Sequence, residues 1–158
     1  MGRSSRHDLR GPRCMIAVDT NILVYAHRAE SPFFDAAVNQ LRSLVEGRSP
    51  WAIPWPCLHE FYSTVTHPKR YLPPSSLGIA TAQINEWLRS PSIRLLGETQ
   101  SHWSVLQPML LASDVKGALV HDARIAAICL QHGVREFWTA DRDFSRFPAL
   151  NCRNPLIV

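Results

Sequence analysis

The sequence predicts an α/β fold with a mostly parallel central sheet. Short apolar runs that fit buried strands alternate with longer segments of helical periodicity, and no internal repeat is visible. The first run, residues 15–18, is apolar without alternation, as expected for a strand buried on both faces. A chain of 158 residues with 46% hydrophobic residues is long enough to bury one core, so we predict a single domain over residues 15–158.

The first part of this domain is predicted to alternate two strands with helices. Thr20 or Asn21 is placed to cap the helix after the first strand, and Gly47 is placed to end the next helix. Pro54 closes the second strand, and Pro56 suits the first turn of a helix, where no N–H is needed. The predicted strands cover residues 15–18 and 51–53, and the helices cover 20–26, 34–46, 56–66 and 76–88, with Leu77 among the inward-facing residues of the last.

The rest of the chain continues the alternation. Ser101 is placed to cap a helix that Pro108 is expected to kink. A later helix ends at His132 and Gly133, and the strand after it ends at Asp141. The predicted helices here cover residues 101–112 and 118–131, and the strands cover 93–96, 137–140 and a short stretch near 151–152.

Net charge gives little information about partners. The chain carries a net charge of +4, but residues 1–14 hold four arginines against Asp8 and so supply most of it. These residues show no periodicity, and we predict a disordered basic leader that results from an upstream start or was added to the chain. The rest of the chain is nearly neutral, so its basic isoelectric point is weak evidence for nucleic-acid binding.

Composition also bears on location and on metal chemistry. No apolar run approaches the roughly 18 residues that a membrane span needs, and residues 1–14 lead into no apolar segment typical of a secretory signal. We therefore predict a cytoplasmic protein without a membrane partner. The four cysteines are widely scattered with no CxxC pair, which favours reduced thiols and argues against a zinc site.

Four carboxylates stand at positions that suggest a common site. Asp19 and Asp141 end predicted buried strands, and Glu60 and Asp122 lie on helix faces that should point inward. In open α/β sheets ligands bind at the carboxyl ends of the strands. Converging carboxylates repel one another unless a cation is present, and carboxylate oxygens suit Mg²⁺ or Mn²⁺. Such a metal could activate water for attack on a phosphodiester, although other metal–phosphate chemistries remain open.

Each acid also has a purely structural interpretation. Asp19 could be only a helix cap, Glu60 an ordinary helix acid, and Asp141 a turn residue. Asp122 could form an ion pair with Arg124 or Arg94, and Asp143 could be a cap.

Other catalytic motifs fit less well. His59-Glu60 begins an HExxH zinc motif, but position 63 is Ser63 where that motif needs histidine. A phosphatase of the haloacid dehalogenase type needs aspartate at position 21, which is Asn21. Neither GxGxxG nor GxxxxGK[ST] occurs, so nothing supports a dinucleotide or P-loop site.

The ordered acidic motifs resemble those of the PIN domain. They are V-D-T-N-I-L-V-Y-A, L-H-E-F, V-H-D-A-R-I-A-A and W-T-A-D-R-D-F, and the resemblance covers nearly all of residues 15–158. Within that superfamily the chain looks most like the VapC toxins of VapBC toxin–antitoxin pairs. The resemblance implies a PIN-like three-layer α/β/α sandwich and an Mg²⁺-dependent endoribonuclease that Mn²⁺ can also support. It further implies a homodimer that a cognate VapB-type antitoxin neutralises.

The resemblance also implies functions for single residues. Asp19, Glu60, Asp122 and Asp141 match the acids that hold the metal and carry catalysis, and Asp143 matches a position that often supplies an accessory metal ligand. Small polar residues that orient these carboxylates are matched by Thr20, Asn21 and Thr139.

Basic residues in predicted loops are candidates for RNA binding. They are Arg28, Lys69, Arg70, Arg142 and Arg146, and Tyr71 is a candidate for stacking on an unpaired base. We predict a toxin that hydrolyses structured RNA such as tRNA or rRNA with metal-activated water. Two alternatives remain: a PIN nuclease in RNA processing without a toxin role, and a non-catalytic PIN module that binds a partner.

Overall fold

The computed structural model describes residues 15–157, so the predicted leader over residues 1–14 lies outside the described residues. Its five strands form one sheet in the order β3-β2-β1-β4-β5, and all four neighbouring pairs are parallel. This confirms the predicted parallel sheet. The strands are β1 (Ile16–Val18), β2 (Trp51–Pro54), β3 (Ile93–Leu96), β4 (Glu136–Trp138) and β5 (Cys152–Arg153).

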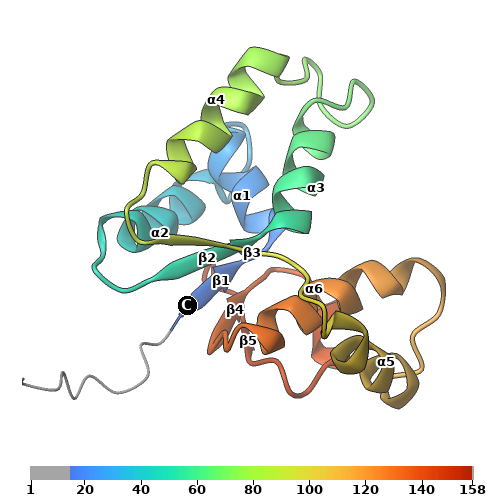
Figure 1. Ribbon diagram of the computed structural model, residues 1–158. Helices are drawn as coiled ribbons and strands as arrows, with labels where there is room; N and C mark the ends of the chain where they lie inside the picture. The colour runs from blue at the N-terminus through green and yellow to red at the C-terminus, as the bar shows by residue number, and fades with distance from the viewer. Residues whose placement is uncertain (1–14, 158) are drawn as a thin grey trace, which may run out of the picture.

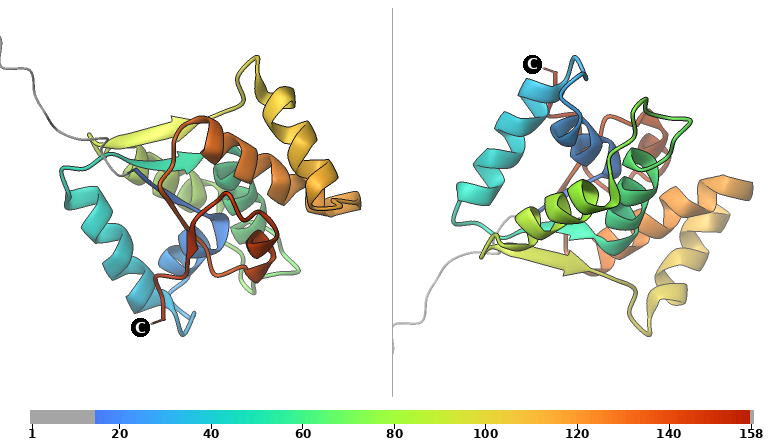
Figure 2. Two further views of the ribbon diagram at one scale, coloured as in Figure 1. Left: turned by 90° about the horizontal axis from the view of Figure 1, so that it is seen from below. Right: turned by 90° about the horizontal axis from the view of Figure 1, so that it is seen from above.

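Helices cover both faces of this sheet. One layer holds α1 (Thr20–His27), α2 (Phe34–Glu46), α3 (Trp55–Val65) and α4 (Leu77–Leu88), and the other holds α5 (His102–Ala112) and α6 (Val120–Gln131) (Figures 1 and 2). Parallel strands need right-handed crossovers. The connections β1–β2 and β2–β3 run in one direction along the sheet and β3–β4 runs back, which places α5 and α6 on the opposite face. The three-layer α/β/α sandwich is therefore confirmed.

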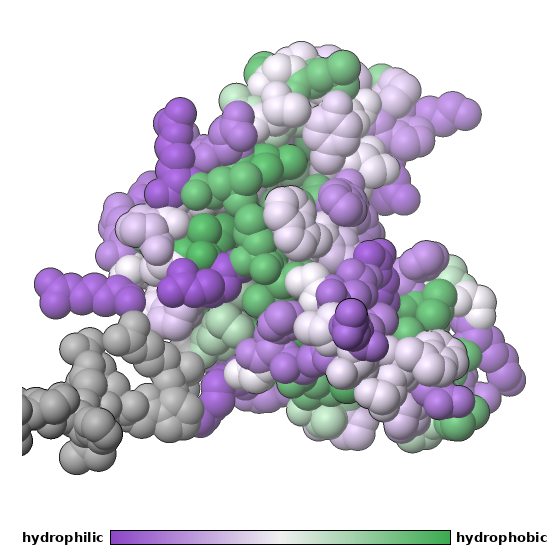
Figure 3. All heavy atoms as spheres, in the orientation of Figure 1, coloured by the Kyte–Doolittle hydropathy of each residue, from purple (hydrophilic) through white to green (hydrophobic). Residues whose placement is uncertain are grey.

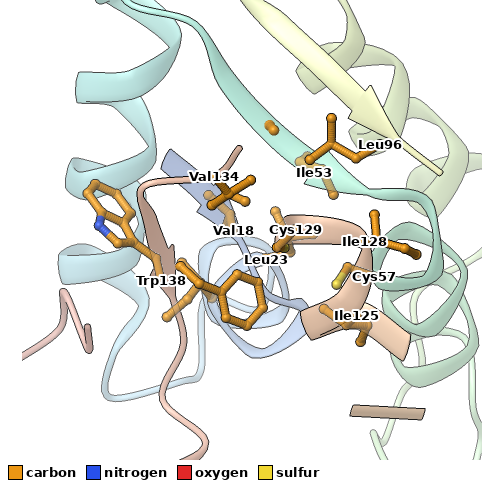
Figure 4. Packing of buried hydrophobic residues seen from close by; sticks show 14 of the residues in the cluster. Val18, Leu23, Ile53, Cys57, Leu96, Ile125, Ile128, Cys129, Val134 and Trp138 are labelled. Atoms are coloured by element: carbon orange, nitrogen blue, oxygen red, sulfur yellow. The ribbon is translucent and has the colours of Figure 1, made fainter. Parts of the chain in front are cut away.

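The core lies between the sheet and these helices. Phe61 on α3 and Phe137 on β4 are completely buried, as are Leu23 on α1 and Trp51 on β2. Figure 4 shows the side chains of α1, α3 and α6 gathered around those of β1 and β2. Complete burial of such a side chain contributes about 1.5–3 kcal/mol, so these contacts fix how the helices sit on the sheet.

Three local predictions are corrected. Asp19, and not Thr20 or Asn21, occupies the cap of α1, because its backbone is still extended and its carboxylate accepts the Thr20 N–H at 2.7 Å. Leu77 does not face the core, since it is the first residue of α4, beyond the packed part of the helix, and 64% of it is exposed. Ser101 precedes α5, but its side chain makes no capping bond.

Two short 3₁₀ helices complete the described chain: η1 (Gly117–Leu119) leads into α6, and η2 (Arg142–Arg146) follows β4. None of the helices within residues 15–157 is both long and apolar enough to cross a membrane.

Candidate metal centre at the carboxyl edge of the sheet

The strand order brings the ends of β1 and β4 together. These strands are neighbours with Val18 opposite Trp138, and the N–H of Asp19 donates to the Trp138 carbonyl at 2.9 Å. From this point the chain leaves β1 toward β2 and leaves β4 toward β5, in opposite directions along the sheet. A crevice forms at such a switch point and is where α/β sheets bind ligands.

Asp19 is buried at this crevice, with 4% of its surface exposed. Its Oδ1 accepts the Thr20 N–H at 2.7 Å, and its Oδ2 accepts the Thr139 hydroxyl at 2.7 Å. Burial nevertheless raises the pKa of Asp19 to about 6, and the nearby charge of Glu60 adds to the rise. The carboxylate is thus held in one orientation, and a bound cation would stabilise its charge.

Asn21 and Thr139 connect the two strand ends. The Asn21 amide donates to Asp19 Oδ2 at 3.2 Å, and its carbonyl oxygen accepts the Ala140 N–H at 3.1 Å. The Thr139 hydroxyl, besides donating to Asp19, accepts the Asp141 N–H at 2.9 Å. These bonds fix Asp19 relative to the loop that carries Asp141.

Two helices add further acids from opposite sides of the sheet. Glu60 projects from α3, where its Oε2 accepts the Thr20 hydroxyl at 3.2 Å. Asp122 lies in the first turn of α6. Its pKa is raised to about 6, chiefly by burial and then by the nearby charges of Asp141, Asp143 and Glu60.

Three of the predicted acids form a compact trio. Carboxylate oxygens of Asp122, Asp141 and Asp143 all lie within 4.8 Å of one another. Asp141 also accepts the Asp143 N–H at 2.9 Å, which fixes the start of η2. Asp19 and Glu60 lie next to the trio. Together with Asp122 and Asp141 they line one cavity of about 230 Å³.

The arrangement fits a hard divalent cation. The acidic residues of this cavity and of the trio offer carboxylate oxygens, which are the ligands that Mg²⁺ and Mn²⁺ prefer. The structural alternative for Asp122 does not hold, because the Arg124 guanidinium pairs with Glu98 and the Arg94 guanidinium donates to the Ile93 carbonyl. Clustered carboxylates without a basic partner repel one another until a cation binds.

A second cavity adjoins the first. This groove of about 490 Å³ runs between α3 and the start of α6, and it shares Glu60 and Asp122 with the acidic cavity. Figure 3 shows the molecule hollowed on the right, where the part containing α3 meets the part containing α5 and α6. The other polar side chains of this groove are His59, Ser63, His121 and Arg124.

The predicted RNA-binding residues occupy different surroundings. Arg70 lines the acidic cavity, and Arg142 lines a separate depression next to Asp141. Lys69 and Arg146 are exposed. Arg28 is bound within the protein: its guanidinium donates to Glu30 at 2.8 Å, to Ser75 at 3.1 Å and to the Pro73 carbonyl at 2.9 Å.

One contact to Asp19 was not predicted from the sequence. The Cys57 thiol donates to Asp19 Oδ1 at 3.6 Å from a completely buried position on α3. The spacing in the sequence could have predicted this contact. Cys57 precedes Glu60 by three positions on the same helix, so both side chains lie near one face.

We then compared the chain with known proteins. The PIN domain family model matches residues 16–150. The ribonuclease VapC48 of Mycobacterium tuberculosis is 30% identical over 137 residues, which cover 87% of this chain and 94% of that protein. Two solved structures share the fold with a TM-score of 0.62 each. One is VapBC2 of Rickettsia felis bound to a promoter DNA fragment, with 20% identity over 89% of this chain and 98% of that one. The other is the sarcin–ricin loop cleaving toxin VapC20 of Mycobacterium tuberculosis, with 18% identity over 82% of this chain and 92% of that one.

Proposed function

Because the chain belongs to the PIN domain family, and within it to the VapC group, we propose that it is an Mg²⁺-dependent endoribonuclease in which Mn²⁺ can replace Mg²⁺. The observation that carries this proposal is the trio of Asp122, Asp141 and Asp143, whose carboxylate oxygens lie within 4.8 Å of one another beside buried Asp19. The VapC48 relative is a ribonuclease by name, which supports RNA as the substrate.

Each group of residues has a distinct function in this reaction. Asp19, Glu60, Asp122 and Asp141 would hold the cation, with Asp143 assisting. When bound, the cation lowers the pKa of a coordinated water and offsets the charge that develops on the phosphodiester. Thr20 fixes the Glu60 carboxylate, and Asn21 and Thr139 fix that of Asp19. Hydrolysis leaves 5′-phosphate and 3′-hydroxyl ends.

Basic residues near the acids would bind the RNA backbone. Arg70 lies in the acidic cavity itself, and Arg142 lies next to Asp141. Guanidinium groups there can bind phosphates on either side of the cleaved bond. Lys69 and Arg146, on neighbouring exposed loops, are proposed to extend this contact.

We further propose that the nuclease is the toxin of a type II toxin–antitoxin pair. It would act in the cytoplasm as a homodimer and be neutralised by a VapB-type antitoxin. The Rickettsia felis VapBC2 structure, which has the same fold, supports such a partner. Structured RNA such as tRNA or rRNA is the proposed substrate, in keeping with the VapC20 toxin that cleaves the sarcin–ricin loop.

The nuclease activity can be tested with purified full-length protein and a mixture of tRNA and rRNA. We expect cleavage with Mg²⁺ or Mn²⁺, none in EDTA, and a loss of about 100-fold or more in Asp122→Asn. Asp35→Asn, which changes an exposed acid at the start of α2, is the matched control and should cleave as the wild type does. Cleavage that persists in both EDTA and Asp122→Asn would contradict the proposed site.

The toxin function requires a test in cells. Expression should arrest growth, Asp19→Asn should relieve the arrest, and co-expression of the antitoxin should do the same. A protein that cleaves RNA in vitro but leaves growth unaffected would instead be an RNA-processing nuclease.

A further inference from the structure

The acidic cavity also has an aromatic part. Tyr25 and Tyr71 line it together with Arg70, in addition to the carboxylates. Tyr25 packs against Phe33, with 5.1 Å between the ring centroids. Tyr71 lies on the loop between α3 and α4 and is only partly buried. Tyr71 also packs against the hydrophobic core, and because it lines the cavity, its ring can contact a nucleotide bound there.

Arg28 supports Tyr71 from behind. Its guanidinium carbon lies 4.4 Å from the centroid of the Tyr71 ring, a distance typical of cation–π stacking. The Arg28 side chain is only 12% exposed, and its bonds to Ser75 and to the Pro73 carbonyl are made on the same loop. One face of the Tyr71 ring is therefore covered, and the orientation of the ring is set by a side chain that is itself fixed.

The loop that carries Tyr71 is held at a second point. Ser75 is buried, and its hydroxyl lies 2.8 Å from His27 Nε2, while the Ser75 N–H donates to the Val65 carbonyl at 2.8 Å. His27 also bonds through Nδ1 to Gln83 on α4 at 3.1 Å. The helix α1 thus has Asp19 as its N-cap, and at its other end His27 and the C-cap Arg28 hold the loop at the edge of the same cavity.

We propose that Tyr71 is the platform on which an unpaired base of the substrate RNA stacks, and that Arg28 is the residue that positions it. This proposal rests on the proposed ribonuclease function and adds to it the form of RNA that the site accepts. Unpaired bases stack on aromatic side chains, whereas bases in a duplex keep their faces covered. Arg70 in the same cavity binds the neighbouring phosphate.

The two cavities define the path of the strand. They meet at Glu60 and Asp122, where the cleaved phosphodiester would lie. Nucleotides on one side of this bond reach Tyr71, and those on the other side enter the groove lined by His59 and Arg124. A substrate that follows this path is single-stranded at the point of cleavage, as in the loop of a structured RNA.

Stacking can be measured apart from cleavage. The inactive Asp122→Asn protein is mixed with a hairpin RNA whose loop carries the fluorescent base 2-aminopurine, and the change in fluorescence reports stacking. When Tyr71→Phe is added to Asp122→Asn, the protein should bind the RNA as tightly as Asp122→Asn alone. When Tyr71→Leu is added instead, binding should weaken about 5- to 100-fold and the fluorescence change should be lost. Trp103→Leu, at an exposed aromatic residue on α5, is the matched control and should change nothing.

The positioning function of Arg28 has a separate readout in the active enzyme. Arg28→Lys keeps the charge but loses the forked bonds to Ser75 and Pro73, so KM should rise about 10-fold while kcat stays within about twofold. The thermal unfolding of Arg28→Lys is measured in parallel. If this variant unfolds at the same temperature as the wild type and its KM is still raised, the effect comes from the position of Tyr71 and not from a loss of stability. A KM equal to that of the wild type would contradict this function.

The outcomes separate this proposal from the proposed function. If the wild type cleaves RNA and Tyr71→Leu binds and stacks like the wild type, the platform is wrong and the nuclease stands. If no RNA is cleaved but the fluorescence change depends on Tyr71, the platform stands and the nuclease is wrong. Equal binding of a hairpin and a fully paired duplex would contradict the single-stranded path.

Discussion

Asp19→Asn should change how the stability of the metal-free protein depends on pH. The carboxyl group of Asp19 titrates near pH 3.8 when it is free and near pH 6 in the fold, where burial raises its pKa. Between these values the folded protein keeps a proton that the unfolded chain has lost. The free energy of unfolding therefore falls as the pH rises through this interval, and the loss is complete above the folded pKa.

The size of this effect follows from the two pKa values. At about 1.4 kcal/mol for each pH unit between them, the loss at neutral pH amounts to about 3 kcal/mol. Asparagine has no charge to bury, so the unfolding free energy of Asp19→Asn should not fall in this way as the pH rises. The contribution of Asp122 is shared by both proteins, because the charges that act on it, those of Asp141, Asp143 and Glu60, are retained.

Urea unfolding in EDTA between pH 4 and pH 7.5 measures the effect. The unfolding free energy of Asp19→Asn minus that of the wild type should become more positive by about 2.5 kcal/mol over this range, because about 0.5 kcal/mol of the full effect is already present at pH 4. Asp35→Asn is the control and should follow the wild type. Parallel profiles for Asp19→Asn and the wild type would refute the reasoning, since they would mean that Asp19 is not destabilised by its burial.

Three further outcomes are expected. Thr139→Val removes the bond to Asp19 Oδ2 and should weaken Mn²⁺ binding about 10- to 100-fold in calorimetry; unchanged affinity would contradict the orienting function of the hydroxyl. Mn²⁺ at about 100 times its dissociation constant should raise the unfolding free energy of the wild type by about 2.7 kcal/mol, and the same concentration should have little effect on Asp122→Asn. Phe61→Ala should lower the unfolding free energy by about 3–5 kcal/mol and Leu77→Ala by less than about 0.5 kcal/mol, because only Phe61 is buried; similar losses would contradict the corrected position of Leu77.

The sheet, and the position of Asp19 near Asp141, could both be predicted from the sequence because the arrangement of parallel strands determines both. Apolar runs gave the strands, and parallel strands bring their carboxyl ends to one edge. Glu60 and Asp122 followed from helical periodicity, which tells which face of a helix points inward. These inferences use only short-range patterns and general topology.

Other features depend on long-range contacts that no local pattern encodes. Leu77 has the spacing of a buried residue, but periodicity does not say where a helix extends beyond the core. The intramolecular partners of Arg28, a predicted RNA-binding residue, depend on how the loop around Tyr71 folds back on α1. Capping and metal binding are alternatives for Asp19 in the sequence, yet in the structure the same carboxylate makes the cap and lines the acidic cavity.

The order of the strands has a consequence for the timing of activity during synthesis. β4 pairs with β1, although Thr139 at its end is 120 residues from Asp19. A nascent chain that has emerged only through α6 contains Asp19, Glu60 and Asp122 but neither Asp141 nor Asp143, so two carboxylates of the trio are absent. Contacts so distant in sequence require a long loop to close before they can form. If the trio is needed for cleavage, as proposed, a ribosome that makes this protein would not be exposed to active nuclease until residues 141–143 have also been translated.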